Sequence, residues 1–212
     1  MARVSHKTRI YELYLGRIQR GEIGRGVRLV DTAIAAELGV SRMPVRDALM
    51  RLAHEGYLTA TSRGFTLPDL GPATIREIFE IRRLLEPRAA ALAAQALSPA
   101  GIAAMECALA DARGTLDSGD ITLFYRACEQ FRSGWLSAVP NRELRETIRR
   151  CQAQVQAVRL ATMADPPAQR IIVDGQSDLM DAFRRRDAVA AADRMLRFVL
   201  AAEETWRRLT GA

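Results

Sequence analysis

Cysteine, histidine and lysine are scarce in this sequence of 212 residues, and long apolar runs are absent. Cys107, Cys128 and Cys151 are odd in number and lie far apart without a Cys-x-x-Cys pair, which argues against a disulfide framework and against a thiolate zinc site. No apolar run approaches the roughly 18 residues that a membrane-spanning helix needs. The charged N-terminal segment also differs from a secretory signal. These absences predict a cytoplasmic protein with reduced thiols and no membrane partner.

Motifs that would indicate catalysis are also absent. The only histidines, His6 and His54, lie in the first third of the chain, so the larger remainder lacks the commonest general base. The sequence has no Gly-x-Ser-x-Gly, His-Glu-x-x-His, phosphate-loop or dinucleotide-binding pattern. Adjacent acids such as Glu203 and Glu204 are typical of a solvated helix face. We therefore predict that the protein is not an enzyme.

Positive charge is concentrated in the N-terminal third. Residues 1–70 hold 11 Lys and Arg against 7 Asp and Glu, whereas the rest of the chain holds 20 against 18. Almost all of the cations are arginine, with Lys7 the only lysine. An excess of positive charge in one segment is expected if that segment contacts a polyanion such as DNA.

The sequence predicts two domains and a mainly α fold. Pro68-Asp69-Leu70-Gly71-Pro72 interrupts any helix, so we place the boundary there, with domains at 1–70 and 71–212. The first domain is expected to contain three helices and a small β-hairpin. Long alanine-rich amphipathic segments with almost no β-branched runs predict an all-α bundle in the second.

Helical spacing in the first domain predicts a helix-turn-helix. The first helix is expected to bury Ile10, Leu13, Tyr14 and Ile18. A second helix over 31–38 ends at Gly39, and the hydroxyl of Ser41 can cap a third helix. That third helix is expected to bury the stripe formed by Val45, Ala48, Leu49 and Leu52. Two helices joined by a short turn that contains glycine constitute a helix-turn-helix motif.

The polar face of the third helix predicts the DNA contacts. Arg42 and Arg46 are four residues apart and project from one face, where guanidinium groups can bind guanine edges in the major groove. The alternative is that both are ordinary solvated arginines, with Asp47 nearby to pair. After Gly56, residues 57–60 and 65–67 are expected to be strands flanking a 62–64 turn. This hairpin is a wing that places Arg63 near a groove or a phosphate.

The segment LVDTAIAAELGVSRMPVRDALMRLAHEGYLTATSRGFTL resembles the winged helix-turn-helix domain of the GntR family of transcriptional regulators. EIFEIRRLLEPRAAALAA, FRSGWLSAVPNREL and DLMDAFRRRDAVAAADRM resemble the C-terminal domain of its FadR-type subfamily, the FCD domain. The resemblance implies a homodimer that binds a palindromic operator, and a helical bundle that binds a small-molecule effector. By analogy it also implies a repressor that releases DNA when the effector binds.

The resemblance also carries over site residues. Met43 replaces a small polar residue that is more usual in the family, so the operator sequence cannot be inherited from relatives. The predicted DNA-binding set is Arg28, Thr32, Ser41, Arg42, Met43, Arg46, Arg63 and Gly64.

Many FadR-type domains bind a divalent metal through an acidic residue and three histidines. The matching positions here are Cys128, Arg132, Gln176 and Phe198, of which arginine and phenylalanine cannot ligate a metal and glutamine is a poor ligand. We therefore predict no metal and no cofactor. Helical phase places Arg82 in an inward stripe with Ile78, Leu85, Ala89, Leu92 and Ala96. It places Arg132 at the edge of the face formed by Leu123, Ala127, Phe131 and Trp135. It also places Gln176 among Ile172, Leu179, Met180 and Phe183, and Phe198 centrally among Ala191, Met195 and Ala202.

Two interpretations of the inward arginines stay open. Arg82 and Arg132 can be satisfied by carboxylates such as Glu86 or Glu129, or reach solvent. Alternatively they bind an anionic effector in place of the metal, either a small carboxylate or a larger acyl-coenzyme A. The predicted effector-binding set is Arg82, Cys128, Arg132, Gln176 and Phe198. If Phe198 fills the bundle, the second domain is only a constitutive dimerisation domain.

Overall fold

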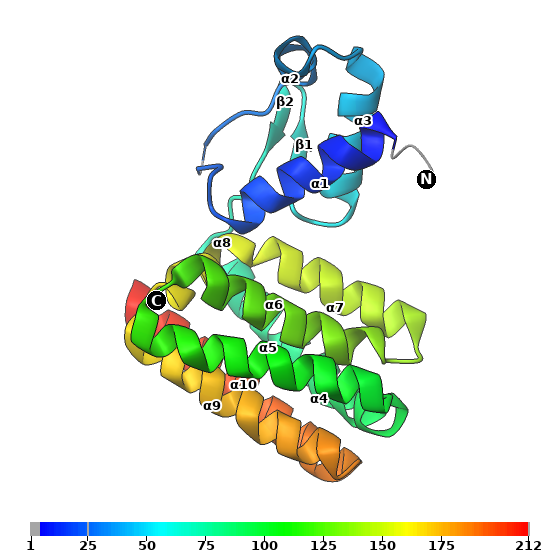
Figure 1. Ribbon diagram of the computed structural model, residues 1–212. Helices are drawn as coiled ribbons and strands as arrows, with labels where there is room; N and C mark the ends of the chain where they lie inside the picture. The colour runs from blue at the N-terminus through cyan, green and yellow to red at the C-terminus, as the bar shows by residue number, and fades with distance from the viewer. Residues whose placement is uncertain (1–4, 25, 212) are drawn as a thin grey trace. The chain divides into compact units, whose positions relative to one another are not determined.

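The computed structural model describes residues 5–24 and 26–211, apart from the side chains of Ala157 and Ala161 (Figure 1). Within these ranges the chain forms ten helices and one two-stranded antiparallel sheet, which confirms the mainly α prediction. The chain divides into two compact units between Gly71 and Pro72, with residues 149–157 grouped with the first unit. None of the described helices is long and apolar enough to cross a membrane.

The first unit contains the elements expected of a winged helix-turn-helix, namely α1 (His6–Gln19), α2 (Asp31–Leu38), α3 (Arg42–His54), β1 (Thr59–Thr61) and β2 (Gly64–Thr66). Helix α1 begins where the Ser5 hydroxyl accepts a hydrogen bond from the Thr8 backbone N–H, at 3.2 Å. Helix α2 has the predicted bounds and ends at Gly39, whose φ of 64° is left-handed and favours glycine.

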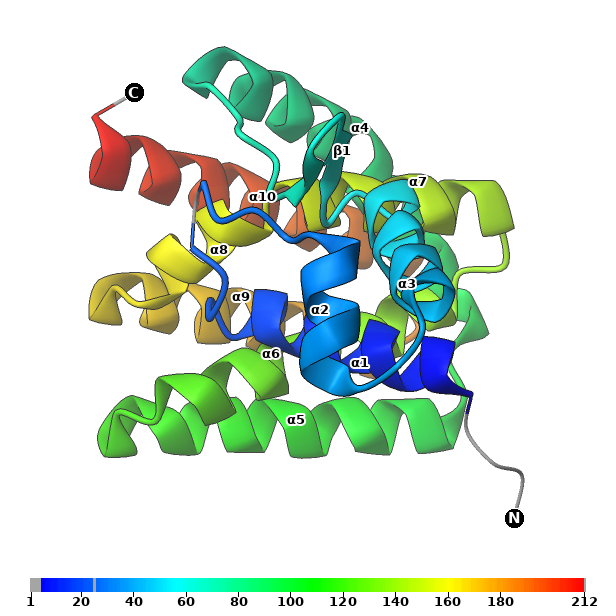
Figure 2. The ribbon, with the colours of Figure 1, turned by 90° about the horizontal axis from the view of Figure 1, so that it is seen from above.

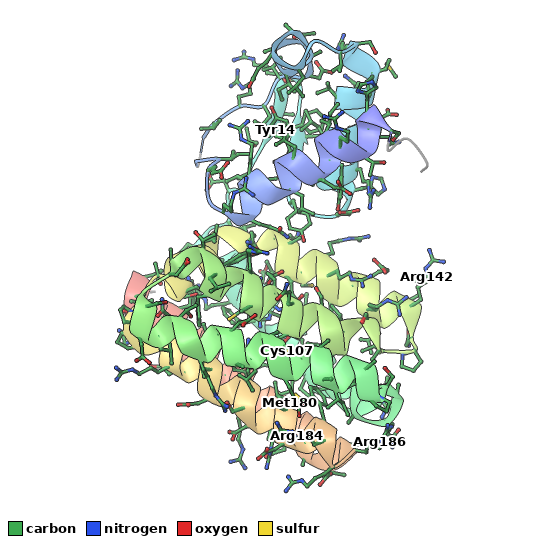
Figure 3. The ribbon with its side chains drawn as sticks, viewed as in Figure 1. Tyr14, Cys107, Arg142, Met180, Arg184 and Arg186 are labelled. Atoms are coloured by element: carbon green, nitrogen blue, oxygen red, sulfur yellow. The ribbon has the colours of Figure 1, made fainter. Side chains whose placement is uncertain are left out.

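The core of the first unit is made by one face of each helix and by the wing. Tyr14 of α1 (labelled in Figure 3) is almost completely buried, and the predicted stripe of α3 is buried throughout. Leu13 was expected in this core but is 43% exposed. It follows Ile10 by three residues, yet the narrow buried stripe of α1 continues through Tyr14 and Ile18.

The second unit is a bundle of long helices that lie alongside one another (Figures 1 and 2). Its packed pairs are α4 with α10, α10 with α9, α9 with α5, and α5 with α6, while α4 also contacts α6 and α9. Helix α7 belongs partly to each unit, because residues 149–157 are grouped with the first unit. The bounds are α4 (Pro72–Ala96), α5 (Pro99–Ser118), α6 (Ile121–Ser137), α7 (Arg142–Gln154), α8 (Gln156–Met163), α9 (Pro166–Arg184) and α10 (Ala188–Thr210).

Short polar residues set where these helices begin. The side chains of Ser98, Asp120, Asp165 and Asp187 each accept a backbone N–H from the first turn of α5, α6, α9 and α10. Both tryptophans of the chain, Trp135 and Trp206, lie buried in this unit. The bundle is therefore fixed by side-chain caps at its ends and by large apolar side chains in its centre.

The inward face of α4 differs from the predicted stripe. Ala96 is exposed, and Leu85 and Leu92 are only partly buried. Three members of the predicted stripe are buried, namely Ile78, Arg82 and Ala89, and burial extends to other residues around the helix, namely Phe79, Glu86, Ala90 and Ala93. Because α4 packs against α10, α6 and α9, its alanines are buried on several sides, and helical phase alone cannot choose one face.

Candidate functional site

The first candidate site is the outer face of α3. Arg42 and Arg46 are 55% and 50% exposed, and the buried stripe of α3 lies on its other side. Their spacing of four residues places both guanidinium groups on one face of the helix. The face can therefore present two forked cationic donors to a polyanion.

The partner of these arginines is Asp31, at the start of α2, and not Asp47. Oδ2 of Asp31 accepts a hydrogen bond from Nε of Arg42 at 3.0 Å and a second from Nη1 of Arg46 at 3.4 Å. Asp47 instead pairs with Lys7 at 3.3 Å. Burial alone would raise the pKa of Asp31, but the two guanidinium groups outweigh it and hold that pKa below its ordinary value. Sequence reasoning missed this contact, whose only signal was an acid at the start of a helix.

The other residues of α2 and α3 predicted to bind DNA are exposed. Ser41 occupies the N-cap position of α3 with extended backbone, but its hydroxyl makes no capping hydrogen bond, contrary to expectation. Met43 is 63% exposed. Arg28 and Thr32 are exposed before and within α2. The first turn of α3 therefore presents a free hydroxyl and an apolar side chain beside the arginines.

The wing is shorter than predicted and is shifted by up to two residues. In the hairpin, Thr59 of β1 lies opposite Thr66 of β2, and Thr61 lies opposite Gly64. This pairing leaves Ser62 and the exposed Arg63 at the turn. The Thr61 hydroxyl donates to the Gly64 carbonyl at 2.9 Å and accepts the Arg63 N–H at 3.2 Å. This double contact closes the turn and holds Arg63 at the tip of the hairpin.

The second candidate site is a group of buried and partly buried charged side chains in the helical bundle. Arg82 and Glu86 form an ion pair along α4, with Nε of Arg82 2.7 Å from Oε1 of Glu86, and both side chains are at most 9% exposed. The alternative in which an internal carboxylate satisfies Arg82 is therefore the one that the structure contains. Its guanidinium also lies 5.0 Å from the Phe79 ring centre.

Arg132 shares its carboxylate with a second arginine that sequence reasoning missed. Nη2 of Arg159, on α8, lies 2.6 Å from Oε1 of Glu129, whereas Nη1 of Arg132 lies 3.9 Å from the same oxygen, too far for a hydrogen bond. Burial and then the nearby Arg159 lower the pKa of Arg132 to about 10. Three arginines thus accompany two glutamates in this cluster.

The enclosed Nη1 of Arg132 has no hydrogen-bond partner among the described residues, and neither does Oε1 of Gln176. Gln176 is only 4% exposed, and beside it burial raises the pKa of the Cys128 thiol to about 11. Phe198 is partly buried, not central as predicted, and its ring lies against Gly175 of α9. Arg132, Gln176 and Cys128 are thus brought together, while Arg82 is paired separately.

These side chains do not fit a divalent metal. The described residues contain no group of three or more His, Cys, Asp or Glu side chains that could hold one. Guanidinium groups cannot ligate a cation, and a thiol with a pKa of about 11 stays protonated near neutral pH. The positive excess of the cluster would repel a cation and attract an anion.

Comparison with protein families matches both units. The family described as "Bacterial regulatory proteins, gntR family" matches residues 6–67. The family described as "FCD domain" matches residues 77–201, which is more than half of the chain.

Relatives with curated names are regulators. The chain is 33% identical to the Nta operon transcriptional regulator of Aminobacter aminovorans over 137 residues, or 63% of this chain and 64% of that protein. It is 34% identical to the HTH-type transcriptional regulator McbR of Escherichia coli over 53% of this chain and 51% of McbR. It is 43% identical to the gluconate operon transcriptional repressor of Bacillus subtilis over 36% of this chain and 31% of that protein. These three matches thus each span less than two thirds of the relative's length.

Solved structures share the fold. E. coli McbR/YncC superposes with a TM-score of 0.82 at 23% identity, covering 97% of this chain and 99% of that one. A putative GntR regulator of Rhodococcus sp. RHA1 gives 0.74 at 23% identity, covering 99% of both chains.

Proposed function

Because this chain belongs to the GntR family of bacterial regulatory proteins and carries that family's FCD domain, it is a transcriptional regulator, and we propose how it works. Residues 1–70 bind a palindromic operator, residues 71–212 form a homodimer and bind an effector, and the protein acts as a repressor in the cytoplasm. The effector is a small anion held without a metal, and its binding releases the DNA.

The outer face of α3 supports the DNA-binding part of this proposal. Arg42 and Arg46 present half-exposed guanidinium groups from one helix face, and Arg63 stands at the tip of a hairpin closed by hydrogen bonds. A recognition helix contacts bases in the major groove, while a wing and a free helix N-terminus contact the backbone. Arg28, Thr32, Ser41, Met43 and Gly64 complete the proposed contact surface.

Replacing one recognition arginine tests this assignment. We expect Arg46→Ala to weaken operator binding by about 1–3 kcal/mol and to relax base preference at one position of each half-site. The operator is first selected from a random duplex library with the unchanged protein, and affinity is then measured by fluorescence anisotropy. Arg51→Ala, on the same helix but paired with Glu55, is the control. Equal effects of the two substitutions would contradict the proposal.

Homology supports the homodimer and the repressor role. The names of the relatives include a gluconate operon repressor and the repressor RspR of E. coli. Dimeric regulators place two recognition helices in successive major grooves, which explains palindromic operators. The α4–α10 pair of the second unit also leaves apolar side chains exposed, Leu84 at 70% and Leu200 at 45%, as a surface covered by a second subunit would.

The unpartnered Nη1 of Arg132 is the observation that carries the effector proposal. A buried cationic donor without an acceptor is costly, and an anion would supply the acceptor through a charge-assisted hydrogen bond. Gln176 offers an unused acceptor beside it for a hydroxyl or amide of the same ligand. Cys128 lies beside both residues, Phe198 packs on Gly175 next to Gln176 in the sequence, and the charge of Arg82 is already balanced by Glu86. A small carboxylate or the phosphate groups of an acyl-coenzyme A meet these requirements.

Thermal unfolding tests the effector proposal, because a ligand that binds only the folded state raises its stability. The probes are hydroxycarboxylates, simple carboxylates, an acyl-coenzyme A and divalent metals. We expect at least one anion to raise the Tm of the unchanged protein and of Arg126→Met, which removes an exposed arginine of the same helix. Arg132→Met should lose that shift. Stabilisation by a metal that chelator reverses would contradict the metal-free site.

One observation favours a second candidate function. The Phe198 ring fills the space beside Gly175 at a position where metal-binding relatives carry a ligand. A filled bundle would make the second domain a constitutive dimerisation domain with no effector. Unchanged Tm across all anions and metals, together with a stable dimer, would favour this candidate.

A further inference from the structure

We propose that Asp31 is a specificity-determining positioning residue that couples Arg42 to Arg46, so that the two guanidinium groups meet DNA as one unit. This inference rests on the proposed role of the two arginines in base contact. Asp31 itself is not expected to touch a base, since it lies almost buried at the start of α2 while the arginines are half exposed.

The geometry makes Asp31 a bridge between the arginines. A single oxygen, Oδ2, accepts from Nε of Arg42 at 3.0 Å and from Nη1 of Arg46 at 3.4 Å. The carboxylate belongs to the first helix of the motif and both arginines to the second. The contact therefore restrains two long side chains that otherwise have many rotamers. Each guanidinium group has five N–H donors, and each uses one of them in these two bonds, so four per arginine are not used by Asp31.

Asp31 also changes the electrostatics of the surface. Its ionised carboxylate reduces the charge of the three-residue group from two positive charges to one. Binding to any duplex depends on the number of phosphates that cations neutralise, so this negative charge weakens contact with non-operator DNA. On the operator, pre-oriented arginines lose less side-chain entropy when they bind bases. Both effects favour discrimination between sequences over raw affinity.

The test compares Asp31→Asn with Asp47→Asn. Asp47 is an exposed acid on α3 that contacts Lys7 and neither arginine, so its replacement removes the same charge near the same surface. For each variant, anisotropy gives the Kd for the selected operator and for a scrambled duplex across a salt series. We expect Asp31→Asn to lower the ratio of the two affinities about tenfold, the size of one lost bidentate base contact. Asp47→Asn should change both affinities together and keep the ratio.

Two further variants keep the test decisive. Asp31→Glu retains the charge but moves the carboxylate by one methylene, so we expect a lower ratio without tighter binding to the scrambled duplex. Asp31→Glu also replaces Asp31→Asn in the test if Asp31→Asn unfolds below room temperature. The inference about Asp31 would be overturned if Asp31→Asn and Asp31→Glu left the ratio of the two affinities unchanged. If Arg42→Ala and Arg46→Ala still impaired operator binding in that case, the proposed DNA contacts would stand. Unimpaired binding by both arginine variants would overturn the proposed DNA contacts instead.

Discussion

The Phe198 ring of α10 packs so closely on Gly175 of α9 that only glycine fits there. A methyl group on Gly175 would lie 2.9 Å from Cε2 of the ring and nearer still to Cδ2. The short distance between α9 and α10 at this level thus depends on the absence of a side chain at Gly175, just as the contact between α6 and α5 depends on Gly134, which lies against Met105.

Gly175→Ala is expected to destabilise the second unit. Overpacking costs about 1–3 kcal/mol, of which the better helix propensity of alanine returns roughly 1 kcal/mol. Denaturant unfolding should show the net loss, and Phe198→Leu should restore part of it in the double variant. Gly114→Ala is the control, because nothing lies within 4 Å of the added carbon. It should raise stability by about 0.5–1 kcal/mol, and an equal rise in Gly175→Ala would refute the prediction.

Gly64→Ala is expected to distort the wing. Gly64 has a φ of +127°, and an added Cβ would lie 2.6 Å from the Leu29 carbonyl oxygen, which accepts the Phe65 N–H at 2.8 Å. The substitution therefore strains the backbone and breaks the contact between the wing and residue 29. We expect a loss of about 1–3 kcal/mol in unfolding free energy and weaker DNA binding. Gly71→Ala, with open space around it, should change neither.

Glu129 is expected to make stability depend on acid pH. Burial favours its neutral form, but Arg159 and Arg132 outweigh burial and lower its pKa in the folded state. The unfolded chain therefore takes up this proton first as pH falls below about 4.3, the ordinary glutamate value. Its contribution is present above that value and disappears as pH falls through the folded pKa.

Glu129→Gln should make the unfolding free energy depend less on pH in the acid range. It should also reduce stability at pH 7 by up to about 3 kcal/mol, because it removes the negative charge beside two partly buried arginines, Arg132 and Arg159. Urea denaturation between neutral pH and acid measures both effects. Glu77→Gln, at an exposed position of α4, should leave the dependence of the unfolding free energy on pH unchanged. A wild-type pH profile in Glu129→Gln would contradict the expected role.

Only one cysteine is expected to react rapidly in the folded protein. Cys107 is exposed on α5 (Figure 3), whereas Cys128 and Cys151 are buried, and burial raises the pKa of Cys128 to about 11. Because the thiolate is the reactive form, a disulfide-exchange reagent near neutral pH should titrate one thiol per chain, and three after denaturation. Cys107→Ser should remove the fast phase. Rapid reaction of two thiols in that variant would show that the bundle opens.

Sequence reasoning predicted what depends on local spacing. The 31–38 helix, the buried stripe of α3 and the shared face of Arg42 and Arg46 follow from helical periodicity and turn residues. The same periodicity could not assign the face of α4, whose small alanines are compatible with burial on several sides. Phe198 was placed too deep because helical phase gives the direction of a side chain and not how far neighbouring helices cover it.

The missed contacts join residues that are distant in sequence. Asp31 lies 11 residues before Arg42, and their contact depends on the angle between α2 and α3. Arg159 reaches Glu129 from another helix, so spacing along either helix carries no signal of it. The sequence offered Glu86 or Glu129 as carboxylates for Arg82 and Arg132. Only the structure shows that Arg82 is paired with Glu86, while Nη1 of Arg132 lies 3.9 Å from Glu129. Of the two arginines predicted to bind the effector, that difference leaves Arg132 as the proposed anchor.

The placement of the tryptophans gives the molecule an internal optical reporter. Trp135 and Trp206 both lie buried in the second unit, and the sequence of the DNA-binding unit contains none. Intrinsic tryptophan emission therefore follows loosening of the helical bundle and is blind to melting of the winged helix. Circular dichroism, by contrast, responds to helices in both units. Recording the two signals on one sample separates the unfolding of the units without cutting or labelling the chain.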